Sequence, residues 1–500
     1  MFWSFLDSNY FYIKTIINES MNTYLLVLYI LIIIAVCINI LVNTETPSKA
    51  LGYLLLVVSF PVVGVIIYLS VGLNYRKKEL YRKKLEIDEQ EYPKLEKQAM
   101  QFSRETLRRN KDKIGNFNQL ASFSKTKNFT SDNNKATLLV NGEVKFPDVL
   151  KSLRSAQHHI HIEYYIYTND IIGKQVAEVL MEKAKEGVEV RFIYDDFGSS
   201  GIRKNIARQL REAGVEAYPF YKINLIFFAN RMNYRNHRKI IVIDGNLGYV
   251  GGINVSDNYI NNVDEKKLFW RDTHLKIEGT SVRNLQTTFL ADWNFCANQK
   301  IPYSSDYFPV ENETKHYGDH LVQIVTSGPD SKYPKIKYSF IQAIISAKHE
   351  VCITSPYFIP DKSFLDALNI AALSGIDVKI LVPTKGDSFV VNTTTQSYFQ
   401  ELMNAGVKIY TYDKGFVHAK TMVCDKRIAI VGTANLDNRS FDLNFEINAI
   451  VYDKEIATEL KELFDKDLTL STQIVPEVWA QRPLYMKLLE RILHLFSSLM

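Results

Sequence analysis

Two stretches of the sequence carry the residues best suited to chemistry, and they repeat one pattern. NHRKIIVIDGNLGYVGGIN occupies residues 236–254, and VHAKTMVCDKRIAIVGTAN occupies residues 417–435. In both, histidine, lysine, aspartate, glycine and asparagine stand at identical intervals, as HxKxxxxDxxxxxxGxxN. The polar members of the two copies are His237, Lys239, Asp244 and Asn254, and His418, Lys420, Asp425 and Asn435. An edge strand with a wet polar face does not explain a repeat this complete.

These residue types suit the attack on a phosphodiester. Ammonium and amide groups can hold the non-bridging oxygens and neutralise the charge that grows as phosphorus is attacked. One histidine can act as the nucleophile, while the other protonates the departing alcohol and later takes the proton of the incoming one. Because the lysines supply the positive charge, we expect no metal ion and no cofactor. The chain also lacks a P-loop, and an exchange between phosphodiesters needs no nucleotide.

Side-chain alternation separates the aspartates of the repeat from its histidines and lysines. On a strand, His237 and Lys239 point to the same face, whereas Asp244 has the opposite parity and opens the turn DGNLG. Asp425 stands in the same relation to the second copy. We interpret Asp244 and Asp425 as turn or framework residues, with a direct chemical role as the alternative.

Each histidine needs a partner that fixes its orientation. A carboxylate on Nδ1 sets the tautomer that leaves Nε2 free to attack or donate. Asp272 in WRDTHLKIEG follows the first histidine, and Glu446 in NLDNRSFDLNFEIN follows the second, each in a strand-like segment. These two are the predicted histidine-orienting residues, and the alternative is an ordinary surface carboxylate.

The elements that must position these residues form two copies of one α/β unit. In the first half, HHIHIEYYIY, GKQVAEVLMEKAKEG and VEVRFIYDD are typical of strand, helix and strand. HEVCITSPYFIP, KSFLDALNIAALSG and IDVKILVPT repeat that order in the second half. Such alternation indicates a mostly parallel sheet flanked by helices, and a repeat of this length indicates duplicated domains.

Two further groups near the first predicted strand have competing interpretations. His159 and His161 share a face, but no third ligand is evident, so histidines satisfied within the strand are favoured over a metal site. The aromatic run EYYIYTND either packs in the core or borders the path of a substrate. Core packing is the favoured interpretation of that run.

Two uncharged apolar segments precede the repeat, at about residues 24–42 and 51–73. Each has about the 20 residues needed to cross a hydrocarbon core. Lys14 is the one basic residue before the first segment, and no cleavage site of small residues follows that segment. Both features disfavour a signal peptide. A basic cluster lies at residues 76–84, whereas the short loop between the segments holds only Lys49. We therefore expect a multi-pass protein of the cell membrane with its catalytic part in the cytoplasm.

Composition excludes some classes of protein. The 500 residues are 46% hydrophobic and 23% charged, with a net charge of +5. This is an ordinary globular composition with room for several domains, and it does not suggest a dedicated nucleic-acid binder. Four scattered cysteines without a CxxC pair indicate free thiols in a reducing compartment.

These patterns divide the chain into five parts. We expect a membrane region with two transmembrane helices at 1–74, a charged helix and linker at 75–135, α/β domains at 136–312 and 313–480, and an amphipathic C-terminal helix at 481–500. The stripe on that last helix suits either the bilayer or the protein's own core. Its members are Leu484, Leu488, Ile492, Leu495 and Leu499.

The doubled motif resembles that of the phospholipase D superfamily. Within it, YRNHRKIIVIDG, GGINVSDNYI, WRDTHLKIEG, SPYFIPD and GTANLDNRSFDLNFEIN, behind two apolar segments, resemble bacterial cardiolipin synthases over nearly the whole chain. The resemblance implies an α/β fold of two tandem phospholipase D-like α/β/α sandwich domains in a pseudo-twofold arrangement, preceded by two transmembrane helices. The family's motif counts Asp244 and Asp425 with the catalytic residues.

The resemblance also implies a reaction and its partners. A phosphatidyl group would pass from one phosphatidylglycerol to another in the bilayer, releasing glycerol, through a phosphatidyl-histidine intermediate. His237 would be the nucleophile and His418 the acid and base. The phosphate would lie among Lys239, Lys420, Asn254 and Asn435. Gly252 and Thr433 stand where many superfamily members carry serine, which puts a hydroxyl contact from the first copy in question.

Other functions remain as alternatives. A membrane-anchored phospholipase D would hand the phosphatidyl group to water and give phosphatidic acid. A nuclease is disfavoured, because the cytoplasmic part shows no strong basic and aromatic stripe. A lipid-binding scaffold would not need two complete sets of histidine and lysine.

Overall fold

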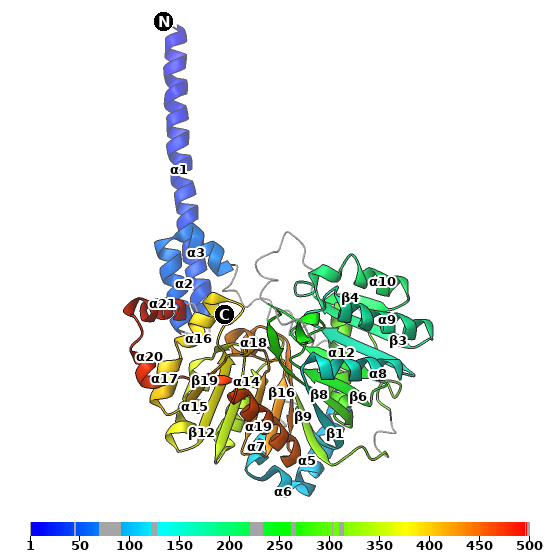
Figure 1. The fold of residues 1–500 in the computed structure, drawn as a ribbon. Helices are drawn as coiled ribbons and strands as arrows, with labels where there is room; N and C mark the ends of the chain where they lie inside the picture. Colours follow the sequence, from blue (N-terminus) through cyan, green and yellow to red (C-terminus); the bar gives the residue numbers. More distant parts are fainter. Residues whose placement is uncertain are drawn as a thin grey trace. The chain divides into compact units, whose positions relative to one another are not determined.

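The computed structural model describes residues 2–44, 47–69, 92–122, 128–220, 234–261, 267–297, 299–302, 304–309, 315–495 and 497 (Figure 1). The described residues belong to two compact units, one made by the N-terminal helices up to residue 69 and one made by the chain from residue 92 onward.

The N-terminal unit begins with a single long helix, α1 (Phe2–Asn43). Its segment Thr23–Asn43 is, among the described residues, the one helix long and apolar enough to cross a membrane. The predicted second span at 51–73 is not confirmed as one helix. The chain there forms α2 (Pro47–Ser59) and α3 (Pro61–Ile67), and residues 70–73 lie outside the described part. Pro61 causes the break, because it has no N–H for the preceding turn and its ring clashes with a continuing helix.

The expected linker is shorter and less solvated than its charge suggests. It contains α5 (Tyr92–Arg109), α6 (Lys111–Ile114) and α7 (Asn118–Ala121). Ile114, Phe117 and Leu120 are fully buried in the core of the C-terminal half. The first strand begins at Thr130 rather than at residue 136. Sparse apolar residues at helical spacing anchor this segment, and the surrounding charges concealed them.

Within the described residues, the first half contributes seven strands of the large sheet and four α-helices. Its strands are β1 (Thr130–Val140), β2 (His159–Tyr164), β3 (Glu189–Asp195), β4 (Glu216–Phe220), β5 (Lys239–Ile243), β6 (Leu247–Gly251) and β8 (Thr273–Gly279), with the short β7 (Phe269–Arg271) outside the sheet. Its helices are α8 (Asn141–Arg154), α9 (Ile171–Lys185), α10 (Ile206–Glu212) and α12 (Val282–Cys296).

The second half repeats this plan. Its sheet strands are β9 (His320–Ser327), β10 (Glu350–Thr354), β12 (Asp377–Pro383), β13 (Lys408–Tyr412), β15 (Thr421–Cys424), β16 (Ile428–Gly432), β18 (Glu446–Val451) and β19 (Ser471–Gln473), and its short strands are β11 (Phe358–Ile359), β14 (Gly415–Val417) and β17 (Leu436–Asp437). Its helices are α14 (Lys335–Ser346), α15 (Lys362–Leu373), α16 (Phe389–Gln396), α17 (Phe399–Asn404), α18 (Asn438–Asp442) and α19 (Lys454–Leu468), followed by α20 (Pro476–Ala480) and α21 (Leu484–His494).

The described strands of both halves join one 15-stranded sheet. Read outward from the antiparallel β1–β9 pair, the first half runs β1-β8-β6-β5-β2-β3-β4 and the second runs β9-β18-β16-β15-β10-β12-β13, with β19 added at the edge. The strand orders correspond position by position, as expected for a duplicated unit.

The prediction of a mostly parallel sheet is wrong. Among the described strands of the large sheet, parallel pairs occur only where β2, β3 and β4, and β10, β12 and β13, lie side by side. The motif strands instead form hairpins, β5 with β6 and β15 with β16. Asp244 and Gly245, and Asp425 and Lys426, have positive φ at these turns, the conformation of a type I′ hairpin turn. Short hairpins therefore replace helical crossovers around the motif.

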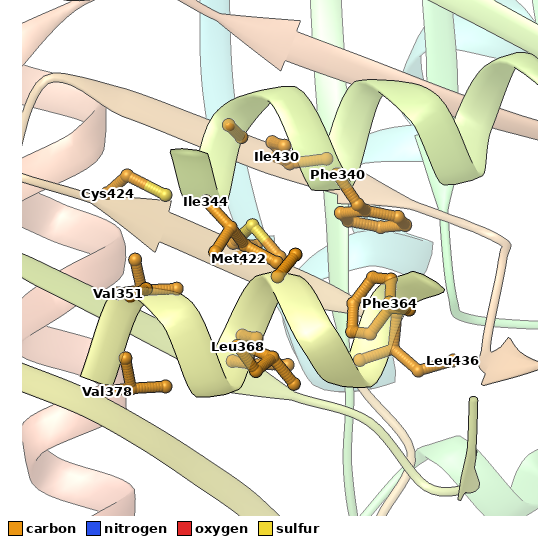
Figure 2. Packing of buried hydrophobic residues seen from close by; sticks show 14 of the residues in the cluster. Phe340, Ile344, Val351, Phe364, Leu368, Val378, Met422, Cys424, Ile430 and Leu436 are labelled. Atoms are coloured by element: carbon orange, nitrogen blue, oxygen red, sulfur yellow. The ribbon is translucent and has the colours of Figure 1, made fainter. Parts of the chain in front are cut away.

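Helices cover both faces of the sheet (Figure 1). In the second half, α14 and α15 bury Phe340, Ile344, Phe364 and Leu368 against strand residues such as Met422 (Figure 2). The opposite face is covered by α12 and α19, whose core includes strand residues from both halves. This shared core fixes the position of one half against the other.

Candidate active site

The two histidines lie just before the motif strands, and each is paired by its backbone with the other half of the sheet. His237 donates its backbone N–H to the carbonyl oxygen of Phe445 at 2.9 Å. His418 donates its own to the carbonyl oxygen of Arg271 at 2.7 Å, where β14 pairs with β7. The residues after Phe445 and Arg271 are the two predicted carboxylates, so these bridges bring them to the histidines.

The carboxylates are therefore exchanged between the halves. Glu446 Oε2 lies 2.9 Å from His237 Nδ1, and Asp272 Oδ2 lies 2.8 Å from His418 Nδ1. Both carboxylates are fully buried. The structure brings together all four residues that we expected to cooperate, but each carboxylate orients the histidine of the opposite half. A histidine that donates from Nδ1 leaves Nε2 available for chemistry.

The two lysines are buried beside their histidines. Lys239 Nζ donates to the carbonyl oxygen of His237 at 2.7 Å. Lys420 Nζ lies 2.9 Å and 3.0 Å from Nδ1 and Nε2 of His418. Burial lowers the pKa of Lys239 to about 7 and that of Lys420 to about 8, and the mutual repulsion of the two ammonium groups contributes to the shift at Lys239. Asp272 and Glu446 oppose the shift at both lysines but do not cancel it, so these buried ammonium groups can gain much by binding an anion.

Burial also favours the neutral form of both histidines. It lowers the pKa of His237, with Glu446 opposing the shift, and it lowers the pKa of His418 to about 3, with Lys420 adding to the effect and Asp272 opposing it. A neutral imidazole has the lone pair that a nucleophile needs. An anionic phosphate nearby raises the pKa of an imidazole, which helps the partner histidine carry a proton.

The aspartates of the motif lie in the framework, as their parity predicted. Asp244 accepts backbone hydrogen bonds from Gln157, His158 and His159 at 2.8–3.0 Å. In the second half, Asp425 accepts equivalent bonds from residues 348–350 at 2.8–3.0 Å. Both tie the motif hairpin to the start of the neighbouring strand. This geometry supports the framework interpretation of both aspartates, and their place among the catalytic residues stays a prediction.

The predicted phosphate-binding asparagines differ from each other. Asn254 accepts from the Ile166 N–H at 3.2 Å and donates to Tyr259 Oη at 2.7 Å, so its amide is already engaged. Asn435 is buried, and its Oδ1 has no hydrogen-bond partner within the described chain. Of the two, Asn435 is the one with an unused polar atom.

Thr433 and Gly252, which stand where many superfamily members carry serine, contact or make room for the two carboxylates and not for a phosphate. Thr433 donates its hydroxyl to Glu446 Oε2 at 2.6 Å. A Cβ at Gly252 would lie 2.1 Å from Asp272 Oδ1, so the carboxylate occupies the space of a side chain there. The hydroxyl of the second copy therefore serves the carboxylate rather than standing free for a phosphate.

Aromatic side chains surround both histidines, and most of these residues were not predicted from the sequence. Tyr165 lies edge-on to His237 with ring centres 4.8 Å apart. Around His418, the rings of Tyr259, Trp270 and Phe416 have centres at 5.5–5.7 Å. Only Tyr165 belonged to a run noted for a border role. The others have no characteristic spacing, and contacts between the halves place them.

A buried lysine outside the motif also supports the site. Lys145 donates to Tyr164 Oη and to the carbonyl oxygen of Ile253, both at 2.8 Å. Since Ile253 precedes Asn254, this amine holds the loop after the first motif.

The favoured interpretation of the strand histidines is confirmed, because Gln286 bonds both His159 and His161.

The fold is shared with phosphatidylserine synthase of Haemophilus influenzae Rd KW20, at a TM-score of 0.55 and 12% identity over 73% of this chain and 93% of that one. Residues 149–293 and 340–468 match the family described as cardiolipin synthase, PLD-like domain.

Relatives agree with that match over almost the whole length. The chain is 42% identical to the major cardiolipin synthase ClsA of Bacillus subtilis (strain 168) across 96% of this chain and 100% of that one. It is 43% identical to a cardiolipin synthase of Alkalihalophilus pseudofirmus across 95% and 93%. This chain belongs to the cardiolipin synthase family.

Proposed function

We propose that this protein transfers a phosphatidyl group from one phosphatidylglycerol to the primary alcohol of another, forming cardiolipin and glycerol. The observation that carries the proposal is the pair of buried histidine–carboxylate contacts, at 2.9 Å and 2.8 Å, with one lysine beside each histidine. Two such sets supply both a nucleophile and an acid–base group. The relatives named as cardiolipin synthases supply the substrate class.

In the first step, Nε2 of His237 attacks phosphorus. The bond between phosphorus and the glycerol headgroup oxygen breaks, and His418 gives its proton to that oxygen. Lys239 and Lys420 stabilise the charge on the non-bridging oxygens, and the amide N–H₂ group of Asn435 is the part of that side chain able to donate to them. Free glycerol leaves, and the phosphatidyl group stays on His237 as a phosphoramidate.

In the second step, the headgroup hydroxyl of another phosphatidylglycerol attacks the same phosphorus. His418 now takes the proton of that hydroxyl, and the bond from phosphorus to His237 breaks. Cardiolipin is released and both histidines return to their starting forms. Over both steps one P–O ester bond is broken and one is formed, without net hydrolysis, so no source of chemical energy is consumed.

Burial of the site supports a lipid alcohol as the acceptor. His237 and His418 are each 8% exposed, and the lysines are almost fully buried. The aromatic rings around His418 add an apolar lining. A site of this kind limits the access of water and favours an acceptor delivered by the bilayer. Hydrolysis to phosphatidic acid is the competing outcome that the product assay distinguishes.

Membrane contact is supported at both ends of the chain. Besides α1, the C-terminal helix α21 directs Leu484, Leu488, Ile492 and Leu495 into solvent at 45–81% exposure. Its polar side is held instead, with His494 bonded to Ser397 Oγ at 2.9 Å. The apolar stripe is thus left uncovered by the protein core. We assign it to the membrane surface, in keeping with a membrane-embedded substrate.

The expected domains and sidedness complete the proposal. Domains at 136–312 and 313–480, related by a pseudo-twofold axis, are supported by the matching strand orders on either side of β1 and β9. The basic residues at 76–84 support a cytoplasmic catalytic unit at the cell membrane. A multi-pass topology would need residues 51–73 to cross the bilayer, and the described part of that segment is divided between α2 and α3.

Product analysis tests the reaction. Full-length protein is mixed with phosphatidylglycerol in detergent micelles, without nucleotide and with chelator, and the products are measured by mass spectrometry. We expect cardiolipin and an equal yield of glycerol. Phosphatidic acid as the main product would identify a hydrolase, and no product from folded protein would contradict an enzymatic role.

A further inference from the structure

The second apolar segment is divided into two helices, and within the described residues, which end at 69, neither is long enough to cross a bilayer. α2 has 13 residues and α3 has 7. At 1.5 Å per residue they extend about 20 Å and about 10 Å. A hydrocarbon core is about 30 Å thick. The direction of the chain at the end of α3 therefore decides the topology.

That direction is given by contacts of Tyr68, which follows α3. Tyr68 Oη donates to Asn39 Oδ1 at 2.7 Å, and its ring lies edge-on to Tyr53 with centres 5.4 Å apart. Asn39 is about one turn from the end of α1, and Tyr53 is in the second turn of α2. Tyr53 is the middle residue of α2, whereas Gly64 contacts Leu56 and Val57 nearer the end of that helix. After Pro61 the chain therefore runs back along α2, toward the connection of α1 and α2.

The fold at the tip is tight. A Cβ at Gly64 would lie 2.6 Å from Leu56 O and from Val57 Cα, so the backbones of α2 and α3 touch at a residue without a side chain. Phe60 keeps its N–H bonded to Leu56 O at 2.9 Å. Pro61, in the first turn of α3, has no N–H to leave unpaired. These features lower the cost of a chain reversal in a medium without water.

The outer surface of this hairpin suits lipid and not water. No residue from Ala50 to Leu69 carries a charge. Large apolar side chains point outward from both helices and the tip, each at 54–66% exposure: Leu55, Val58, Phe60, Val62, Val63 and Ile66. Water would leave this area without apolar partners, whereas acyl chains cover it.

We infer that α2 and α3 form a re-entrant hairpin that enters and leaves the bilayer on one side, and that α1 alone crosses it. The connection at Lys49 and the basic residues at 76–84 then share the cytoplasmic side, as the positive-inside rule favours. Residues before the span lie on the other side. The inference concerns the path of the chain and does not rest on the proposed reaction.

Cysteine accessibility distinguishes this topology from two complete crossings. One accessible cysteine is placed by Ser8→Cys, Lys49→Cys or Gln209→Cys in an active background with Cys37 and Cys296 replaced by alanine, while the buried Cys352 and Cys424 are kept. Gln209 is exposed on α10 and reports the side of the catalytic unit. A membrane-impermeant maleimide is applied to intact cells and to lysed membranes. We expect the Ser8→Cys variant to react in intact cells, and the other two to react only after lysis.

Two crossings predict the reverse for the first two positions. Labelling of the Lys49→Cys variant in intact cells, with the Ser8→Cys variant protected, would overturn the inference. Each variant is first shown to retain its lipid product pattern, so that a misfolded chain is not scored.

A crosslinking test examines the hairpin directly. Asn39→Cys with Tyr68→Cys should be joined by a short bifunctional maleimide, because Tyr68 Oη lies 2.7 Å from Asn39 Oδ1 and the linker takes the place of the tyrosine ring. Asn39→Cys with Phe60→Cys is the matched control and should not, since Phe60 is at the tip. Crosslinking of the control pair alone would contradict the hairpin.

Discussion

Glu446 Oε2 lies 2.9 Å from Nδ1 of His237, although the two residues come from opposite halves of the sheet. The backbone bridge from His237 to Phe445 places them together, and the same device joins His418 to Asp272. Neither half can therefore assemble a complete histidine–carboxylate pair alone. The exchange links folding of the whole sheet to catalysis.

The exchanged pairing predicts which histidine variant each carboxylate variant will resemble. We expect Glu446→Gln to behave like His237→Ala, and Asp272→Asn like His418→Ala, each losing about 10²–10⁴ in turnover of phosphatidylglycerol. A phosphatidyl ester of p-nitrophenol separates the roles, because its leaving group needs no proton. Initial release of p-nitrophenol should survive in Asp272→Asn and be lost in Glu446→Gln. The opposite sorting would show that each carboxylate serves the histidine of its own half.

The lysines predict the alkaline limb of the pH profile. An ammonium group is charged below its pKa, and the pKa values of about 7 for Lys239 and about 8 for Lys420 mean that charge is lost as pH rises through 7–8. kcat/KM should fall between pH 7 and 8, an interval far below the pH at which an ordinary lysine loses its charge. Bound phosphate raises both pKa values, so kcat should fall at higher pH. Lys239→Arg, which stays charged, should extend the limb upward, and an unchanged limb in that variant would contradict the assignment.

The framework role of Asp244 predicts a loss of stability without a loss of chemistry. In Asp244→Asn, an amide N–H₂ group would face the N–H of Gln157, where the carboxylate now accepts at 2.9 Å. We expect the free energy of unfolding of the catalytic unit to fall by on the order of 2 kcal/mol, with kcat of the folded protein within about threefold. Denaturant titration and active-site-normalised rates measure the two effects. Asp425→Asn is the matched variant in the second half, and a hundredfold loss of kcat in folded protein would show a chemical role.

Thr433 predicts an indirect effect on the first histidine. Its hydroxyl donates to Glu446 Oε2 at 2.6 Å, so Thr433→Val leaves a buried carboxylate oxygen without that donor. We expect kcat to fall about tenfold to a hundredfold, since a hydrogen bond to a charged group contributes about 1.5–3 kcal/mol. Thr433→Ser keeps the hydroxyl and should remain near full activity. Equal losses in both variants would indicate packing as the cause.

The exposed stripe of α21 predicts an effect that depends on the form of the substrate. Leu488→Asp combined with Ile492→Asp should reduce activity on phosphatidylglycerol vesicles several-fold, because charges on the apolar side oppose insertion. Activity in mixed micelles should change little. Lys487→Asp, on the same helix but off the stripe, is a control for charge alone. Equal activity of the double variant on vesicles would contradict membrane contact by this helix.

The repeated motif and strand parity were sufficient to select the candidate chemical residues, whose roles remain a prediction, and to assign Asp244 and Asp425 to turns. The partners of the histidines could be identified by type but not by pairing, because the pairing depends on bridges between segments far apart in sequence, such as Asn236 with Phe445. Tyr259 reaches His418 only through the contact between halves. Such contacts leave no periodic pattern.

In the membrane region, prediction from the sequence failed for a different reason. Hydropathy counts apolar residues and marked 51–73 as one span, whereas the break at Phe60 depends on the stereochemistry of Pro61. The dipeptide FP and the nearby Gly64 were the available signals. In the sheet, the turn-forming residues after each motif strand similarly determine hairpins that a count of helices and strands does not reveal.

The central claim is that His237 carries the phosphatidyl group while His418 moves the protons. The most direct measurement uses His418→Ala with the p-nitrophenyl phosphatidyl ester, followed by rapid quenching and peptide mass spectrometry under alkaline conditions that preserve a phosphoramidate. The account predicts one equivalent of p-nitrophenol in a burst and a phosphatidyl group on the peptide that contains His237. No burst in this variant, together with a burst and a modified His418 in His237→Ala, would contradict it.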